Sequence, residues 1–182
     1  REGQEIYRRS LSAILTCAVF ELYRNSRMTI GHSLGNGYYY SLNTDVPVSD
    51  EIITEISNKM NEIVQKDIPF EKETVSKEEA EALFKRQGYP DKVRLIKYMP
   101  YNEVTIYRLG NYLDIEYGAM MPSTGYAKLF ELNKYNTGII LRFPEPINPT
   151  QISPIKNWTK LFSVYRESKT WGAILNINNI GR

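Results

Sequence analysis

The fold is decided by residues 50–88, which read DEIITEISNKMNEIVQKDIPFEKETVSKEEAEALFKRQG. Apolar residues recur every three or four positions over 50–66, and this spacing predicts a helix. Ser49 or Asp50 precedes the first apolar residue and can cap the open N–H groups. Residues 70–75 then alternate as in a half-buried strand. The spacing of the apolar residues therefore changes from that of a helix to that of a strand within one short stretch.

The same stretch ends in a second helix that carries a signal at each end. Ser76 and Glu79 have the spacing of a capping box, in which each side chain satisfies a free N–H group. Gly88 is suited to the left-handed conformation that ends a helix. A short helix over 91–98 is predicted to follow.

Helical and strand patterns on either side complete the predicted fold. A buried apolar stripe predicts a helix over 4–24. β-Branched and aromatic residues between turn signals predict strands over 103–110, 111–117, 126–132 and 137–143, with a tight reversal at Gly110 and Asn111. Because strands follow helices in blocks, the fold class is α+β, with a mostly antiparallel sheet packed with three to four helices.

A proline-rich segment divides the chain into two parts. Residues 144–154, PEPINPTQISP, contain four prolines and cannot sustain a helix or a central strand. We therefore expect a domain over 1–143 and, over 144–182, a linker with a short helix near Trp158–Tyr165 and a strand over 172–179. That tail is too short to be a domain, so it either packs on the body or leads toward a further C-terminal domain.

The composition excludes several classes of protein. The net charge of the 182-residue chain is +2, too small by itself to indicate a nucleic-acid binder. No apolar run approaches the roughly 18 residues that a membrane helix needs, so no membrane contact and a cytoplasmic location are expected. Cys17 and His32 are the sole cysteine and histidine. With so few ligands, neither a metal site nor covalent catalysis is favoured.

The segment 31–40, GHSLGNGYYY, is rich in glycine but lacks the pattern of a phosphate-binding loop. It leads into a strand and not into a helix, so no helix N-terminus is available for an anion. Asn36 and Gly37 favour a hairpin-type turn. In the strand that follows, Tyr38 and Tyr40 share one face, because side chains alternate.

Charged residues offer two further candidate sites, each with a structural alternative. Asp114 and Glu116 lie two apart on a predicted strand and could act as acid and base if buried together, or could line a solvated face. Arg8 and Arg9 on the first helix, with Arg24 and Arg27 near its end, could contact phosphate or RNA. Cations at a helix C-terminus are also stabilising without a ligand.

Several segments resemble the second N-terminal, editing domain of threonyl-tRNA synthetases, which alanyl-tRNA synthetases share. They are YRRSLSAILTCAVFELY over 7–23, IGHSLGNGYYYSL over 30–42, the stretch 56–88 and YLDIEYGAMMP over 112–122. The resemblance implies that family's α+β fold. In that family the working site is an H-x-x-x-H on the first helix and a C-x-x-x-H after the Y-x-D strand. Here the four positions hold Arg9, Ala13, Glu116 and Met120.

Those replacements imply that the family's editing chemistry is lost and that its cleft has new occupants. The candidate ligand-binding residues are Arg9, His32, Asn36, Tyr40, Asp114 and Glu116. No catalytic residue, metal or cofactor is expected in this segment.

The segment 31–40 and the tail WGAILNINNIGR also resemble a group of uridine kinase-like proteins, related to phosphoribulokinases. These carry a degenerate synthetase-like module before an ATP-dependent kinase domain. The chain does not begin with methionine and shows no phosphate-binding loop, so we expect an N-terminal piece whose partner is its own C-terminal kinase-like domain. We expect a non-catalytic module that binds a small ligand or RNA, or that regulates the kinase. The alternatives are a hydrolase that uses Arg9, His32 and Glu116, or a module that only binds RNA.

Overall fold

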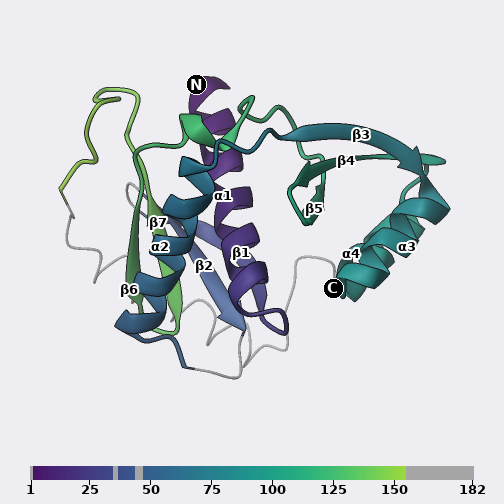
Figure 1. Ribbon diagram of the computed structural model, residues 1–182, viewed down its shortest axis with the longest axis horizontal. Coiled ribbons are helices and arrows are strands. Elements are labelled where there is room, and N and C mark those ends of the chain that lie inside the picture. The colour runs from purple at the N-terminus through teal and green to yellow at the C-terminus, as the bar shows by residue number, and fades with distance from the viewer. Residues whose placement is uncertain (1, 35–36, 44–46, 155–182) are drawn as a thin grey trace, which may run out of the picture.

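The computed structural model describes residues 2–34, 37–43 and 47–154, with His32 and Leu34 described by their backbone alone. Its strands form two separate antiparallel sheets (Figure 1). The larger has the order β1-β2-β7-β6, and the smaller has the order β3-β4-β5. The larger sheet comprises β1 (Arg27–Leu34), β2 (Gly37–Asn43), β7 (Gly138–Arg142) and β6 (Glu131–Tyr135). The smaller comprises β3 (Glu71–Ser76), β4 (Glu103–Leu109) and β5 (Tyr112–Ile115).

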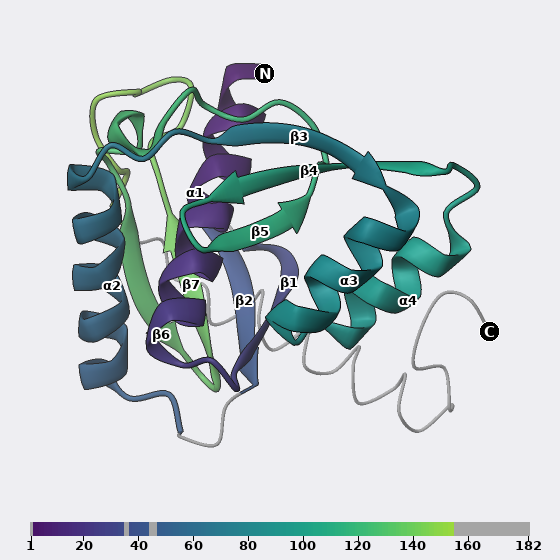
Figure 2. The ribbon, with the colours of Figure 1, turned by 45° about the vertical axis from the view of Figure 1, so that its right-hand side comes forward.

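The helix α1 (Glu2–Leu22) is the centre of the molecule and lies between the two sheets (Figure 2). It contacts β1 of the larger sheet and β5 of the smaller one, so its buried residues run almost without interruption from Ser10 to Phe20. The helix α2 (Asp50–Gln65) packs beside α1 and against β6. The two helices thus cover one face of the larger sheet.

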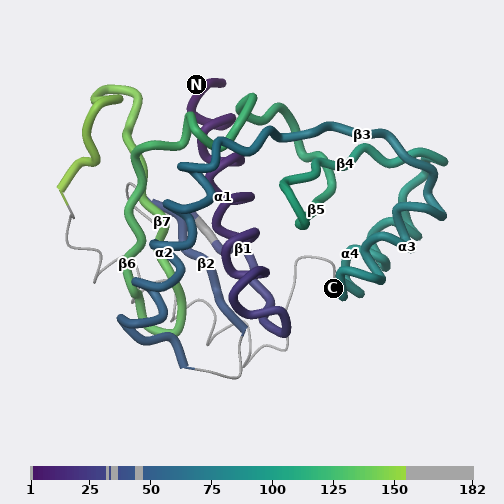
Figure 3. Tube along the Cα trace, viewed as in Figure 1, coloured from purple at the N-terminus to yellow at the C-terminus, as the bar shows by residue number. Residues whose placement is uncertain are grey.

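The helices α3 (Lys77–Gln87) and α4 (Pro90–Tyr98) pack together, and α3 packs against β3 and β4 of the smaller sheet. This pair lies to one side of the molecule (Figure 3). Where α3 meets α4, Arg27 of β1 lies over the ring of Tyr89, 4.7 Å from its centroid. The fold is therefore α+β with antiparallel sheets and four α-helices in the described residues, as the sequence predicts.

Local signals in the sequence are confirmed by the backbone. The Ser49 hydroxyl accepts a hydrogen bond from the amide of Ile52, and the Ser76 hydroxyl accepts one from Glu79. Gly88 ends α3 in the left-handed region, with φ of 83°. Gly110 also has a positive φ and joins β4 to β5. Each of these signals acts within a few residues, which is why the sequence alone reveals them.

Two paired strands, β1 and β2, flank residues 35–36, and only the second of them was predicted. Residues 27–34 are already a strand, and Leu34 pairs with Gly37. Gly37 therefore lies in β2 and not in the turn. A Cβ at this position would come within 2.8 Å of the Ile140 side chain on β7, so close strand packing explains the glycine.

The predicted strand over 126–132 is wrong, because β6 begins at Glu131. Residues Thr124–Tyr126 form a short 3-10 helix instead. The Thr124 hydroxyl donates to the carbonyl of Ile63 at 2.7 Å and accepts from the amide of Ile68 at 2.9 Å. This anchor to the end of α2 depends on residues distant in sequence. The smaller sheet is likewise a separate unit, where one sheet was expected.

The remaining predictions concern the proline-rich segment, the C-terminal tail, Asn36 and the absence of a membrane helix. Residues 144–154 contain no helix or strand, only an isolated bridge between Glu145 and Asn148. The predicted helix near Trp158 and the strand over 172–179 lie outside the described residues, as does Asn36. In the described part of the chain, none of the helices has the length and apolar character needed to cross a membrane.

Candidate functional site

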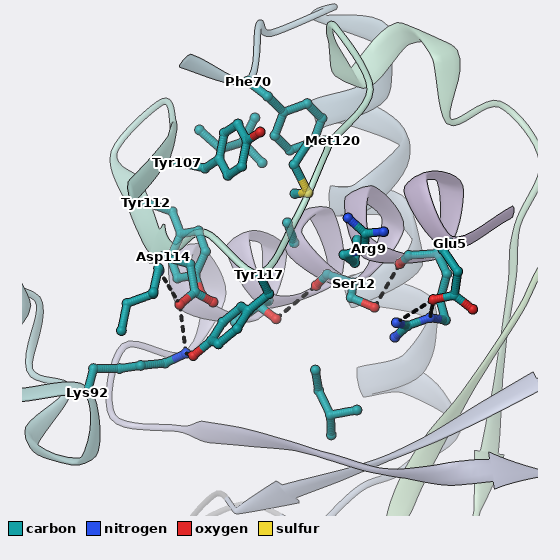
Figure 4. A pocket seen from close by; sticks show the side chains of 16 residues that line it. Glu5, Arg9, Ser12, Phe70, Lys92, Tyr107, Tyr112, Asp114, Tyr117 and Met120 are labelled. Atoms are coloured by element: carbon teal, nitrogen blue, oxygen red, sulfur yellow. Dashed lines mark hydrogen bonds and ion pairs between the residues drawn. The ribbon is translucent and has the colours of Figure 1, made fainter. Parts of the chain in front are cut away.

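A cavity of about 500 Å³ lies between α1 and the three-stranded sheet. Figure 4 shows its side chains converging from α1, from β4 and β5, from α4 and from the loop after β5. Its lining from α1 comprises Glu5, Arg8, Arg9, Ser12, Ala13 and Thr16. These positions are three or four residues apart, or next to one another, so they share one side of the helix. Segments far apart in sequence therefore build a single site.

One end of the cavity is a cluster centred on Asp114. Lys92 on α4 donates from Nζ to Asp114 Oδ1 at 2.7 Å and to the Tyr117 hydroxyl at 3.0 Å. Tyr112 donates its hydroxyl to Asp114 Oδ2 at 3.1 Å. The Ile115 amide also donates to Asp114 Oδ1, at 2.7 Å. Three donors therefore hold this carboxylate (Figure 4).

The surroundings of Lys92 and Tyr112 shift the pKa of both side chains. Burial by itself lowers the pKa of Lys92, but the Asp114 charge and the hydrogen bonds to Asp114 and Tyr117 outweigh it and raise the pKa. Lys92 is therefore a cation and not a base at neutral pH. Burial, together with Asp114, raises the pKa of the Tyr112 hydroxyl well above its usual value, so Tyr112 keeps its proton and donates.

The opposite end of the cavity is formed by two arginines with different partners. Arg8 donates from Nη2 to Glu5 Oε2 at 2.8 Å and lies over the ring of Tyr38, 4.9 Å from its centroid. Arg9 donates from Nη1 to the carbonyl oxygen of Ala119 at 2.8 Å. The two neighbours therefore leave α1 toward different sides of the cavity.

Arg9 depends on a special backbone at Gly118. That glycine has φ of 136°, and a Cβ there would collide with the guanidinium of Arg9. The Ser10 hydroxyl accepts from the amide of Met121 at 2.8 Å. The loop after β5 is thus docked on α1 from both sides, and it presents Met120 to the cavity.

Behind the cavity wall, Tyr40 of β2 forms a hydrogen bond with the Ser12 hydroxyl. Tyr40 is fully buried, and burial raises its pKa, so the phenol stays neutral. Tyr38 and Tyr40 share the face toward α1, while Tyr39 packs on the other face, as the alternation predicts. Tyr40 therefore supports a residue that lines the cavity.

The structure places the predicted candidate residues as follows. Arg9 and Asp114 line the cavity, and Tyr40 lies behind it. Glu116 does not line it and instead accepts from Lys72 Nζ at 2.7 Å. Asp114 and Glu116 thus bind different lysines. The side chain of His32 and the whole of Asn36 lie outside the described residues.

Cys17 is buried in the core and is not a nucleophile. Burial and the nearby Glu21 carboxylate raise the pKa of its thiol to about 12. Among the described residues, no group of three or more histidine, cysteine, aspartate or glutamate side chains could hold a metal ion.

Sequence reasoning missed Lys92, Tyr112 and Tyr117 as site residues. Lys92 lies 22 residues before its carboxylate partner and begins a short helix, where a lysine carries no special signal. The one available clue is the spacing of Tyr112 and Asp114, two apart on a predicted strand and so on the same face.

The chain is similar in sequence to known threonine–tRNA ligases. It is 37% identical over 131 residues to the enzyme of Nitratidesulfovibrio vulgaris (strain DP4), an alignment that covers 72% of this chain and 20% of the ligase. It is 40% identical over 134 residues to that of Laribacter hongkongensis, covering 73% and 21%, respectively. The match to the Rubrobacter xylanophilus enzyme is 38% over 131 residues, covering 72% and 20%. The chain carries a threonine–tRNA ligase-type domain.

This domain spans about a fifth of the length of the relatives it matches. No family model matches the chain. The α+β architecture agrees with the editing-type fold that the resemblance implies.

Three of the four positions where the resemblance places the editing ligands line one cavity: Arg9, Ala13 and Met120. The fourth, Glu116, is bound by Lys72 outside it. In this threonine–tRNA ligase-type domain, one cavity is therefore lined by three of these four positions.

Proposed function

We propose that this domain is a non-catalytic module, related to synthetase editing domains, that binds a small ligand in the cavity between α1 and the three-stranded sheet. The observation that carries the proposal is the lining itself. The cavity is open to a ligand, and each of its charged side chains has a fixed partner in the fold. Arg9 and Lys92 are cations, and Asp114 accepts hydrogen bonds from three donors.

Hydrolysis requires a group that accepts a proton near neutral pH and lies within hydrogen-bond reach of the attacking water. Lys92 cannot act so, because its pKa is raised. Tyr112 cannot either, because its phenol keeps its proton. Glu5 and Asp114 are the two carboxylates of the lining. Arg8 forms an ion pair with the first and Lys92 with the second. The lining therefore supports binding better than chemistry.

The role of the module in a larger protein is part of the proposal. The resemblance to uridine kinase-like proteins supports a place before an ATP-dependent kinase domain, which would phosphorylate uridine or a related substrate. The module would then regulate that domain or present a ligand to it, in the cytoplasm. The kinase-like domain is the partner expected on this proposal.

A second candidate function is RNA binding, which exposed aromatic side chains favour. Tyr98 and Tyr101 are 83% and 71% exposed, and Lys97 precedes Tyr98. Exposed rings can stack on unpaired bases, and cations contact phosphate. A filter-binding titration of the chain with a single-stranded RNA tests this function. Affinity that does not fall as salt rises would contradict it, because phosphate contacts release counterions.

A nuclear magnetic resonance titration of the ¹⁵N-labelled chain tests the leading proposal. The probes are threonine, uridine, phenylacetate and phenylacetamide, each added separately. We expect at least one probe to shift the amides of Ala13, Thr16, Tyr117 and Met120. Ala13→Leu, which fills the cavity, should abolish these shifts. Ala82→Leu, on the exposed face of α3, should leave them. Probes that shift only residues outside the cavity, or none, would contradict the proposal.

A further inference from the structure

The charges that line the cavity do not balance. Arg8 is paired with Glu5 at 2.8 Å, and Lys92 is paired with Asp114 at 2.7 Å. Arg9 forms no ion pair with any carboxylate in the described part of the chain, and its one hydrogen bond there is to the Ala119 carbonyl. The lining therefore carries two neutralised pairs and one uncompensated positive charge, located at Arg9.

The guanidinium of Arg9 retains donors for a ligand. A guanidinium has five N–H groups in a planar fork, and one nitrogen, Nη1, is directed to Ala119. A planar fork binds carboxylate and phosphate through two parallel hydrogen bonds. The side chain is partly buried against the loop, so an anion bound there is shielded from water on one side.

The wall beside Arg9 is apolar. Figure 4 shows Met120 next to the Arg9 guanidinium, with Phe70 and Tyr107 beyond it on the same side of the cavity. The Lys92–Asp114 pair lies on the other side. An anionic group at Arg9 would therefore leave the rest of a ligand against Met120, Phe70 and Tyr107. Because Lys92 neutralises Asp114, that carboxylate does not repel an anion strongly.

We infer that the ligand is a small organic anion, with a carboxylate or phosphate against Arg9 and an apolar body against Phe70, Tyr107 and Met120. This inference rests on the proposed function, since it names the ligand class of that same cavity. An aminoacyl ester has no carboxylate for Arg9 to bind. The site thus favours a free acid over an ester of the same acid.

The experiment compares matched probes for binding to the full chain. Phenylacetate and phenylacetamide have nearly the same shape and differ in charge, and phenyl phosphate replaces the carboxylate by phosphate. Dissociation constants are measured from the amide shifts of Ala13 and Met120. We expect phenylacetate or phenyl phosphate to bind about tenfold or more tightly than phenylacetamide, because hydrogen bonds to charged groups are the stronger ones. The tighter of the two anions identifies which acid group the site takes.

Variants assign that preference to Arg9. Arg9→Met should remove it, and Arg9→Lys, which keeps the charge but not the fork, should retain part of it. Arg86→Met, on the exposed side of α3, should leave it unchanged. The comparison of probes on the unaltered chain decides the question even if Arg9→Met does not fold.

Two results would overturn the inference, and they are distinguishable. Phenylacetamide binding as tightly as both anions would remove the ligand class but leave the proposed binding function intact. No binding by any probe, neutral or charged, would remove the proposed function as well.

Discussion

The ammonium of Lys92 lies 2.7 Å from Oδ1 of Asp114, so α4 is joined to β5 by an ion pair between segments 22 residues apart. Both side chains are mostly buried, with 18% and 27% of their surfaces exposed. The pair closes one end of the cavity, and it attaches the pair of helices α3 and α4 to the small sheet. Its geometry therefore bears on both stability and binding.

Removal of Lys92 from its ion pair with Asp114 should lower the stability of the fold. Lys92→Met leaves the Asp114 carboxylate partly buried without its counter-ion, and we expect a loss of about 1–3 kcal/mol in the free energy of unfolding. Lys72→Met is the matched control, because it breaks a pair whose lysine is 55% exposed. We expect that control to lose much less, because exposed ion pairs contribute little to stability. Urea denaturation measures both, and equal losses would contradict a structural role for the Lys92 pair.

Stability should fall at alkaline pH through Tyr89. Burial raises the pKa of its hydroxyl to about 12, above the value near 10 in an unfolded chain. The neutral phenol therefore stabilises the fold fully below about pH 10, and this contribution is lost as the pH rises toward 12. Between pH 9 and 11.5 the unaltered chain should lose about 2 kcal/mol more than Tyr89→Phe.

The phenylalanine variant is suited to this test, because Tyr89 makes no side-chain hydrogen bond to the described residues that its loss would break. Tyr101→Phe, at an exposed ring, is the control and should follow the unaltered chain. Unfolding in urea at each pH gives the difference. Identical pH dependence in Tyr89→Phe and the unaltered chain would show that Tyr89 does not titrate as a buried group.

Gly138 should tolerate no side chain. A Cβ there would collide with the backbone oxygen of Tyr40 and lie 2.6 Å from Cε2 of Tyr39. We expect Gly138→Ala to destabilise the fold by about 1–3 kcal/mol, because β7 must move away from β2. Gly3→Ala, where a Cβ meets nothing within 4 Å, should change stability by no more than about 0.5 kcal/mol. Thermal unfolding measures both, and a stable Gly138→Ala would show that β2 and β7 pack less closely.

How far the sequence predicts this fold depends on the range of each interaction. The helix caps at Ser49 and Ser76 and the turns at Gly88 and Gly110 act within about four residues, and all were predictable. The start of β6 was not, because Thr124 is held by Ile63 and Ile68 across more than fifty residues. The division into two sheets was not predictable either, since strand order has no local signal.

The same distinction applies to the site. Arg9 was identified through the resemblance, and Asp114 also through its spacing from Glu116; both line the cavity. Lys92 was missed, since only the packing of α4 brings it to Asp114. Glu116 was expected beside Asp114, but it lies just past the end of β5 and is bound by Lys72. Ion pairs between side chains on different helices and strands therefore separate Asp114, which lines the cavity, from Glu116, which does not.

Hydrolysis of mischarged threonine tRNA by the full chain is the most direct test of a binding module without editing chemistry. We predict release of the amino acid no faster than in buffer, since both carboxylates of the lining, Glu5 and Asp114, are paired with cations. Hydrolysis well above the buffer rate, lost in Arg9→Ala, His32→Ala or Glu116→Ala, would contradict this and would establish the hydrolase instead.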